Sequence, residues 1–264
     1  MTIESLANPS IVLRPSPVSP QAFQALNYHH LAALGIIASL GVAIAWASAV
    51  LPPVARKWLG RFIGLLLLGY AAVFYAQQWI GHSLSWQYSL PLELCSLVLI
   101  ACILCMFWPH PFTAEIAYFW GLGGVLHAIA TPDLGWSFPS WEFILFFWGH
   151  GATVLAIVYL IASGSFKPGR ASILRMMLAL NLYGAAVGAI DTVTGWNYGY
   201  LCRKPSMPSL LDYLGPWPWY LLSLELIAFV SFFLLDLPWR LLILFRTKRQ
   251  ARTAGNRAKD SVLR

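Results

Sequence analysis

Charged residues are scarce in this sequence, and its long apolar runs contain no lysine. Of the 264 residues, 10% are charged and 59% are hydrophobic. Apolar runs longer than about 18 residues are typical of membrane-spanning helices, so the composition argues against an ordinary soluble domain. The formal net charge of +7 does not indicate nucleic-acid binding, because the basic residues gather in loops and in a tail. The composition therefore predicts an all-α integral membrane protein.

Cysteine is also rare, and its spacing matches no zinc site. Cys95, Cys102 and Cys105 lie within apolar segments, and Cys202 is alone in a loop. This distribution predicts neither a disulfide framework nor a structural metal. The lack of lysine in every apolar segment excludes a retinal-type photoreceptor, because that class needs a Schiff-base lysine within a helix.

What the sequence does have is a series of apolar segments. Each is close to the ~20 residues that cross a hydrocarbon core of about 30 Å. They cover residues 31–51, 62–81, 90–108, 112–130, 141–163, 172–191 and 217–237. We predict a seven-transmembrane-helix bundle over residues 28–246 and a basic cytoplasmic tail over residues 247–264. Residues 1–27 are polar, carry prolines and lack the pattern of a signal peptide, so we expect a disordered or surface-lying arm.

Lysine and arginine predict the orientation of this bundle. The loops after the first and fifth segments hold three basic residues each, and the stretch from Arg240 onward holds eight. The opposite side has Arg14, Arg203 and Lys204. The positive-inside rule therefore places the N-terminus outside and the C-terminus in the cytoplasm.

Two pairs of glycines have the spacing that lets helices approach closely. Gly60 with Gly64, and Gly184 with Gly188, each follow the small-xxx-small pattern. We interpret both pairs as packing positions rather than as chemistry.

Polar residues within the segments gather in the outer half of the predicted membrane. At ~1.5 Å per residue, most lie between roughly 5 and 14 Å below the outer edge. Glu115, near the inner end of the fourth segment, is the main exception. Because polar groups in lipid normally face one another or a wet cavity, we expect one shared cavity open to the outer leaflet. Its expected members are Glu93, Cys95, His127, His150, Asn181 and Glu225.

Covalent catalysis is the first chemistry open to this cluster. A thiol in apolar surroundings ionises poorly, so Cys95 as a nucleophile needs an adjacent imidazole, and His150 would be its base. Gly149 and Gly151 flank His150 and leave the helix surface beside the imidazole bare. A supporting polar network would orient the imidazole or donate to a developing oxyanion. Its candidates are Glu93, His127, Asn181 and Glu225.

Two other chemistries stay open for the same cluster. His82, His127 and His150 with the acids would hold a metal that activates water, although no H-E-x-x-H or similar spacing supports this. Alternatively, the polar residues would line a proton or solute path, but no internal repeat typical of transporters is present. Each residue also has a structural alternative, with cysteine as an apolar filler and the acids in an interhelical network.

Four stretches of the chain are distinctive: LPLELCSL, GGVLHAIATPDL, FFWGHG and KPSMPSLLDYLGPWPWY. They resemble the YwaF-like family of bacterial integral membrane proteins, which is related to eukaryotic membrane acyltransferases that remodel ether phospholipids. The resemblance runs from about the second predicted segment to the end of the seventh. It implies a seven-helix bundle and a mechanism with one cysteine and one histidine, whose motif and spacing Cys95 and His150 match. The proline-bearing arm departs from the family pattern.

The combined prediction is a membrane-embedded lipid acyltransferase of the bacterial cytoplasmic membrane, with a phospholipid substrate and with no cofactor or metal. The alternatives are a lipid hydrolase, a non-enzymatic transporter of protons or small solutes, and a structural or lipid-binding membrane protein. The sequence leaves the oligomeric state open.

One loop is predicted to bind the phosphate headgroup of the lipid at the outer surface, with its basic residues acting by charge. The alternative is a folded cap whose basic residues pair with Asp191 and Asp212. The loop residues concerned are Asn197, Tyr200, Arg203 and Lys204.

Overall fold

The computed structural model describes residues 22–205 and 210–262, and every helix or strand element in that part of the chain is a helix. One isolated bridge joins Ala22 to Trp136, and no strand forms within the described residues. The predicted arm over residues 1–27 falls mostly on residues 1–21, which lie outside the described part. The prediction of an all-α protein is confirmed for the residues that are described.

Within the described residues, five helices are long and apolar enough to cross a membrane. They correspond to the first, second, fifth, sixth and seventh predicted segments, and the chain is therefore a multi-pass membrane protein. The helices are α1 (Tyr28–Val50), α2 (Pro53–Ile80), α7 (Trp141–Ala162), α8 (Ser172–Thr194) and α9 (Trp219–Val262), whose apolar part is Trp219–Phe245.

The third predicted segment, 90–108, begins later than expected. Its helix α4 (Leu94–Phe107) has 14 residues, which at ~1.5 Å per residue make about 21 Å. A short helix α3 (Trp86–Ser89) precedes it, and the chain between the two is not helical. Pro91 explains the break, because the residue before a proline is pushed out of the helical conformation.

The fourth predicted segment, 112–130, is helical but not uniform. It consists of α5 (Pro111–Glu115), a π-helix η2 (Ile116–Val125) and α6 (Leu126–Ala130). π-helical turns are rare and are frequent at functional sites. Because neither α4 nor this composite element is one long α-helix, the count of seven spans stays a prediction, as does the orientation of the termini.

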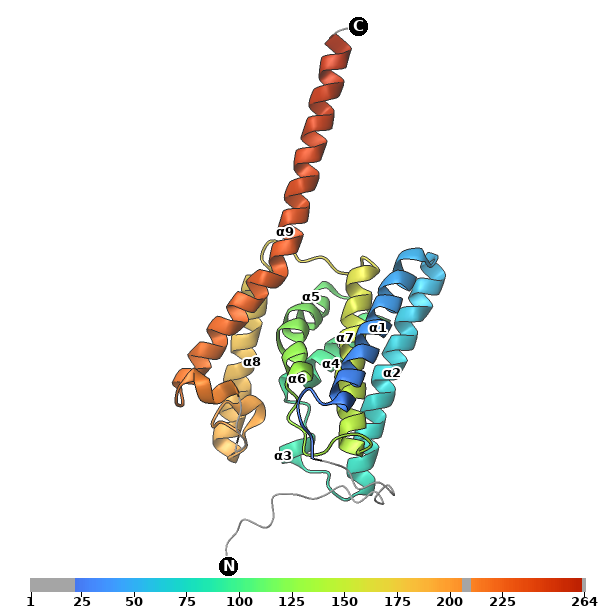
Figure 1. Cartoon of the computed structure of the whole chain (residues 1–264). Coiled ribbons are helices and arrows are strands. Elements are labelled where there is room, and N and C mark those ends of the chain that lie inside the picture. Colours follow the sequence, from blue (N-terminus) through green and yellow to red (C-terminus); the bar gives the residue numbers. More distant parts are fainter. Residues whose placement is uncertain (1–21, 206–209, 263–264) are drawn as a thin grey trace, which may run out of the picture.

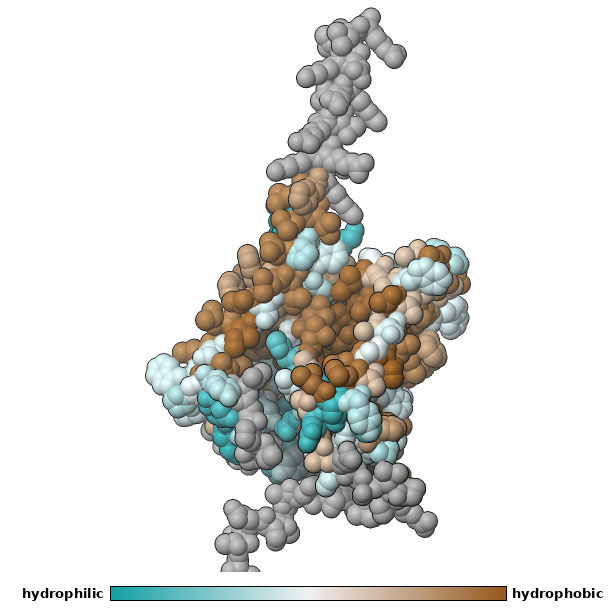
Figure 2. All heavy atoms as spheres, viewed as in Figure 1, coloured by the Kyte–Doolittle hydropathy of each residue, from teal (hydrophilic) through white to brown (hydrophobic). Residues whose placement is uncertain are grey.

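Helix α7 is the centre of the fold. It packs against α1, α2, α4, η2 and α6, and 67% of its apolar window is buried, against 11% for α8. In Figure 1, α1 and α2 lie on one side of α7, the shorter helices lie next to it, and α8 and α9 form a separate pair beyond them. Figure 2 shows hydrophobic residues over most of this face and hydrophilic residues toward the end near α3.

We call that end of the bundle the cap end, because it also holds the connection between α8 and α9. This connection, the cap, comprises the described residues 195–205 and 210–218 and includes the 3-10 helices η3 (Tyr198–Tyr200) and η4 (Leu210–Leu214). Gly195, with a φ of 75°, ends α8 in the left-handed conformation that favours glycine. The predicted loop residues Asn197, Tyr200, Arg203 and Lys204 lie in the cap.

At the opposite end of the bundle, ion pairs and hydrogen bonds hold α8 and α9 in place. Glu115 is 3% exposed, and it accepts hydrogen bonds from Ser172 at 2.6 Å and from the guanidinium of Arg175, whose Nε lies 3.0 Å away. Arg240 of α9 pairs with Asp236 at 2.7 Å and donates to the carbonyl of Gly169. These bonds tie α8 and α9 to the rest of the bundle at that end.

The glycine pattern is confirmed for one pair and not for the other. A Cβ atom at Gly60 would lie 2.6 Å from the hydroxyl of Tyr159, and one at Gly64 would lie 2.8 Å from Cβ of Met106. Gly60 and Gly64 therefore allow α2 to approach α7 and α4. Gly184 has no atom within 4 Å of such a Cβ, so close packing does not require it.

These contacts predict opposite effects of the same substitution at two helical glycines. Gly64→Ala would force Met106 and Phe107 to move and would cost about 1–3 kcal/mol of stability. Gly184→Ala would leave the thermal midpoint unchanged or slightly higher, since alanine is the better helix former. Thermal unfolding of both variants in one detergent measures this, and equal effects would contradict the packing of α2 on α4.

Candidate functional site

Cys95 occupies the first turn of α4. Glu93 is the N-cap of this helix, but its side chain does not cap it. The backbone N–H groups of Ser96 and Leu97 donate to the carbonyl of Glu93, whereas those of Leu94 and Cys95 have no backbone acceptor among the described residues. The thiol of Cys95 is free and half-buried. A negative charge on its sulfur would therefore lie where helix geometry favours an anion.

His150 lies in the middle of α7, and a hydrogen bond defines which of its ring nitrogens carries the proton. Its Nδ1 is 3.0 Å from the carbonyl oxygen of Phe146, and its ring stacks on that of Phe146 with centroids 4.1 Å apart. Since a carbonyl oxygen only accepts, Nδ1 carries the proton in the neutral ring and Nε2 is the basic nitrogen. Nε2 has no hydrogen-bond partner in the described chain, so it is available to take a proton.

Cys95 and His150 lie on helices that pack against each other, α4 and α7. Within the described residues, no hydrogen bond joins the sulfur of Cys95 to the imidazole. Tyr70 of α2 packs on α7, because the end of its ring lies against Gly149, the residue before His150. The structure thus brings the predicted nucleophile and base to adjacent helices.

Asn181 and Glu225, two members of the predicted network, contact each other. The amide nitrogen of Asn181 donates to Glu225 at 2.5 Å and to the carbonyl of Met177 at 2.9 Å. Both amide hydrogens are therefore in use, and the pair joins α8 to α9. His127 is exposed on α6, and its imidazole forms no hydrogen bond with any described residue.

Glu93 connects α4 to the cap. Its carboxylate accepts a hydrogen bond at 3.1 Å from the backbone N–H of Gly199. Nearby, the hydroxyl of Tyr198 donates to the carbonyl of Trp86 at 3.0 Å. Glu93, two residues before Cys95, therefore connects the cap to the start of α4 by a hydrogen bond.

Asn197 organises the cap from within. Its side-chain oxygen accepts from the backbone N–H groups of Cys202 and Arg203 at 3.1 and 3.0 Å, and its amide donates to the carbonyl of Arg203 at 2.9 Å. The guanidinium of Arg203 in turn donates to the carbonyl of Gly195 at 3.4 Å. All of these bonds stay inside the cap.

Lys204 and Tyr200, the other two predicted loop residues, differ in whether their polar side-chain group has a partner. Lys204 pairs with Asp212 at 3.9 Å and lies over the ring of Tyr220, 5.6 Å from its centroid. Tyr200 keeps its hydroxyl free of partners among the described residues. Burial, and the nearby carboxylates of Asp133 and Glu93, raise the pKa of Tyr200, so its hydroxyl is a hydrogen-bond donor at neutral pH.

Asp191 has no partner at all among the described residues. Its side chain is 1% exposed, and neither carboxylate oxygen has a hydrogen-bond donor. It interacts electrostatically with Glu93 and with the hydroxyls of Tyr183 and Tyr198. The ion pair with Arg203 or Lys204 that the cap hypothesis allowed is not formed at Asp191, whereas the pair of Lys204 with Asp212 is.

A metal centre finds no support in the described part of the chain. No three side chains of His, Cys, Asp or Glu come together there in a way that would hold an ion. His82 follows the end of α2, His127 is on α6 and His150 is on α7. The described structure therefore does not support a metal site at these three histidines.

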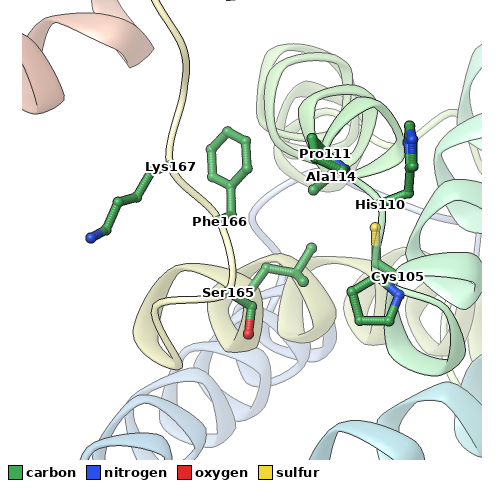
Figure 3. A pocket seen from close by; sticks show the side chains of 9 residues that line it. Cys105, His110, Pro111, Ala114, Ser165, Phe166 and Lys167 are labelled. Carbon is green, nitrogen blue, oxygen red and sulfur yellow. The ribbon is translucent and has the colours of Figure 1, made fainter.

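A cavity of about 280 Å³ lies at the opposite end of the bundle, lined by Cys105, His110, Phe166 and Lys167 among others. Figure 3 shows Lys167 extending away from the other labelled side chains. The thiol of Cys105 donates to Thr113 at 3.3 Å, and Nδ1 of His110 accepts from the N–H of Phe112. Both groups have local structural bonds, and the cavity contains neither Cys95 nor His150.

The arrangement of the cap predicts a graded response to substitutions at Asn197. Asn197→Ala removes three hydrogen bonds and should raise the rate of trypsin cleavage after Arg203 roughly tenfold or more, whereas Asn197→Asp loses the donor alone and should be intermediate. Limited proteolysis followed by mass spectrometry measures the three rates. Equal rates for wild type and Asn197→Ala would contradict a cap held by this side chain.

Comparisons with known proteins bear on the chain as a whole. A search of curated proteins and a search of solved structures found no match. A family model described as the TMEM164 family matches residues 24–236, which cover α1, α2, α7, α8, the cap and the first part of α9. This agrees with the predicted membrane protein, and the kinship with YwaF-like proteins and with ether-phospholipid acyltransferases stays an expectation from the four sequence stretches. The chain belongs to the TMEM164 family.

Proposed function

We propose that this protein is a membrane-embedded lipid acyltransferase that works through a thioester on Cys95. The observation that carries the proposal is the position of Cys95, in the first turn of α4 beside unpaired backbone N–H groups. An adjacent helix holds His150 with its basic nitrogen free. A thiol, a base and fixed N–H donors are the parts that acyl transfer requires.

In the first half of the reaction, Nε2 of His150 takes the proton from the sulfur of Cys95. The thiolate attacks the carbonyl carbon of a phospholipid ester, and the electron pair of the C=O bond moves to oxygen. The N–H groups of Leu94 and Cys95 stabilise this oxyanion. When the C=O bond re-forms, the ester C–O bond breaks, the alkoxide takes the proton from His150 and a lysolipid leaves.

In the second half, the hydroxyl of an acceptor lipid attacks the thioester. His150 takes the proton of that hydroxyl, the thiolate of Cys95 leaves and His150 returns the proton to the sulfur. Water in place of the acceptor lipid would give a fatty acid, so lipid hydrolysis is the alternative outcome of the same chemistry. Neither route requires a cofactor.

The cap would recognise the phosphate headgroup of the lipid. Of its four predicted residues, Asn197 is used inside the cap and Lys204 pairs with Asp212. The free hydroxyl of Tyr200 is then the best-placed donor, with Arg203 at the exposed edge. In this proposal the cap faces outward from a bacterial cytoplasmic membrane, as the distribution of basic residues predicts.

A solute or proton path is less well supported by the polar contacts. It would depend on Glu93 and Glu225, but Glu225 is paired with Asn181 and Glu93 accepts from Gly199. Both carboxylates therefore have structural partners in the described chain. The thiol of Cys95 has no hydrogen bond to any other residue of the described chain.

The proposal predicts a covalent acyl-enzyme. After incubation with phospholipid, intact-mass analysis of the purified protein should show an acyl adduct that hydroxylamine removes. Cys95→Ala should abolish the adduct, and His150→Ala should slow its formation by about 10²–10⁴-fold, because general-base assistance is lost. Cys202→Ser is the matched control, since this cysteine is also half-buried but lies in the cap.

Two outcomes would contradict the proposal. One is an adduct of the same yield on Cys95→Ala, which would show that the acyl group is attached to another side chain. The other is acyl transfer between lipids at the wild-type rate in Cys95→Ala, which would exclude a thioester on this residue.

A further inference from the structure

The chain immediately before α1 is bonded to the loop between α6 and α7. We call this segment, residues 22–27, the strap. At its start, the backbone N–H of Phe23 donates to the carbonyl of Gly135 at 3.1 Å. At its end, the side-chain amide of Asn27 donates to the hydroxyl of Ser137 at 3.1 Å. The strap therefore connects the start of α1 to the chain that leads into α7.

His30, in the first turn of α1, lies between the strap and the bundle. Its side chain is 0% exposed and lies between the rings of Phe23 and Phe147, with centroids 5.6 and 5.7 Å away. Its Nδ1 accepts a hydrogen bond from the backbone N–H of Leu26 at 3.0 Å, and its Nε2 is 2.9 Å from the carbonyl oxygen of Ile129. One imidazole thus contacts the strap, α6 and α7.

These two hydrogen bonds require a neutral imidazole. A backbone N–H only donates, so Nδ1 of His30 accepts and carries no proton. A carbonyl oxygen only accepts, so Nε2 carries the single proton of the ring. In a charged imidazolium both nitrogens donate. A second proton would therefore set the N–H of Nδ1 against the N–H of Leu26, and two buried donors would lose their acceptor.

No counter-ion for a charged His30 is found among the described residues. The titratable groups toward this end of the elements around it are His29 on α1, His127 on α6, Asp133 in the loop and Glu142 on α7. Nδ1 of His29 is 3.2 Å from the hydroxyl of Ser137, and the carboxylate of Glu142 accepts from the N–H of Gly135 at 3.2 Å. The other two are exposed, and the strap itself has no charged residue.

We propose that His30 is a pH-sensitive switch that keeps the strap closed while its imidazole is neutral. As the pH falls, the bond from Leu26 to Nδ1 opens, and a proton from water binds to the uncovered nitrogen. The N–H of Leu26 then bonds to water, and the strap separates from the loop between α6 and α7. Only the open strap binds the second proton, so its closure is stable at higher pH and is lost at lower pH.

The switch acts on the helix that carries His150. Phe147, which lies against His30, follows Phe146, whose ring stacks on that of His150 with centroids 4.1 Å apart. In the predicted orientation this end of the bundle faces outward, so the switch would respond to the pH outside the cell. The inference goes beyond the proposed acyl transfer and does not depend on Cys95.

Hydrogen exchange of the full chain, followed by mass spectrometry, tests the switch. The readout is the protection factor of the strap amides, which is the exchange rate of an unstructured peptide at the same pH divided by the measured rate. An exposed imidazole takes its second proton below about pH 6.5, so the protection factor should fall by up to ~tenfold for each pH unit below that value. Above it, the protection factor should not change with pH.

Two asparagine variants identify the histidine that is responsible. His30→Asn places an acceptor oxygen at about the position of Nδ1 and cannot titrate, so its strap should show no dependence on pH. His29→Asn is the matched control at the next position and should keep the wild-type fall in protection. Thermal unfolding identifies a variant that fails to fold. Exchange of the imidazole C2 hydrogens in the wild type then shows whether His30 takes up its proton over the pH range in which the strap opens.

Four results would overturn the switch. The first is a protection factor that stays constant as the pH falls, and the second is the same fall in His30→Asn as in the wild type. The third is a fall that disappears in His29→Asn, which would assign the switch to His29. The fourth is uptake of a proton by His30 without loss of strap protection. None of these results changes the test of the acyl adduct on Cys95, which is measured separately.

Discussion

The break before α4 is the constraint on which the proposed chemistry depends. Pro91 keeps Leu90 out of the helical conformation, and the helix starts at Leu94 rather than at residue 90. A helix that started four residues earlier would place Cys95 in its second turn, where its N–H would bond to a carbonyl inside the helix. The late start leaves that N–H unpaired and also frees Glu93 to hold the cap.

Much of the fold follows from the pattern of apolar residues. The hydropathy of long segments located α1, α2, α7, α8 and α9 well, because a span of about 20 apolar residues has few other uses. Hydropathy does not report helix type or the exact start of a helix. For this reason the π-helix at Ile116–Val125 and the short α4 were not predicted, although Pro91 was a visible signal for the latter.

The site was harder to predict, because depth along a helix is one coordinate of three. Depth grouped Asn181 and Glu225 with Cys95 and His150; the structure pairs Asn181 with Glu225 across α8 and α9, and no hydrogen bond among the described residues joins that pair to Cys95 or His150. The close packing of Tyr70 on Gly149 was not predicted either, because tyrosine in a membrane segment is normally interpreted as an interfacial aromatic. A contact of this kind, between helices that are distant in the sequence, leaves no local pattern in the sequence.

The attachment of α8 and α9 has a consequence for handling the protein. Their ties to the rest of the bundle include polar bonds at both ends, such as Arg175 to Glu115 at one and Gly199 to Glu93 at the other. Apolar contact along α8 is sparse, and lipid chains solvate its leucines as well as protein does. Water and salt compete with those polar ties at the bilayer surfaces. It follows that a detergent that hydrates the headgroup region would release this helix pair before it loosens the centre around α7.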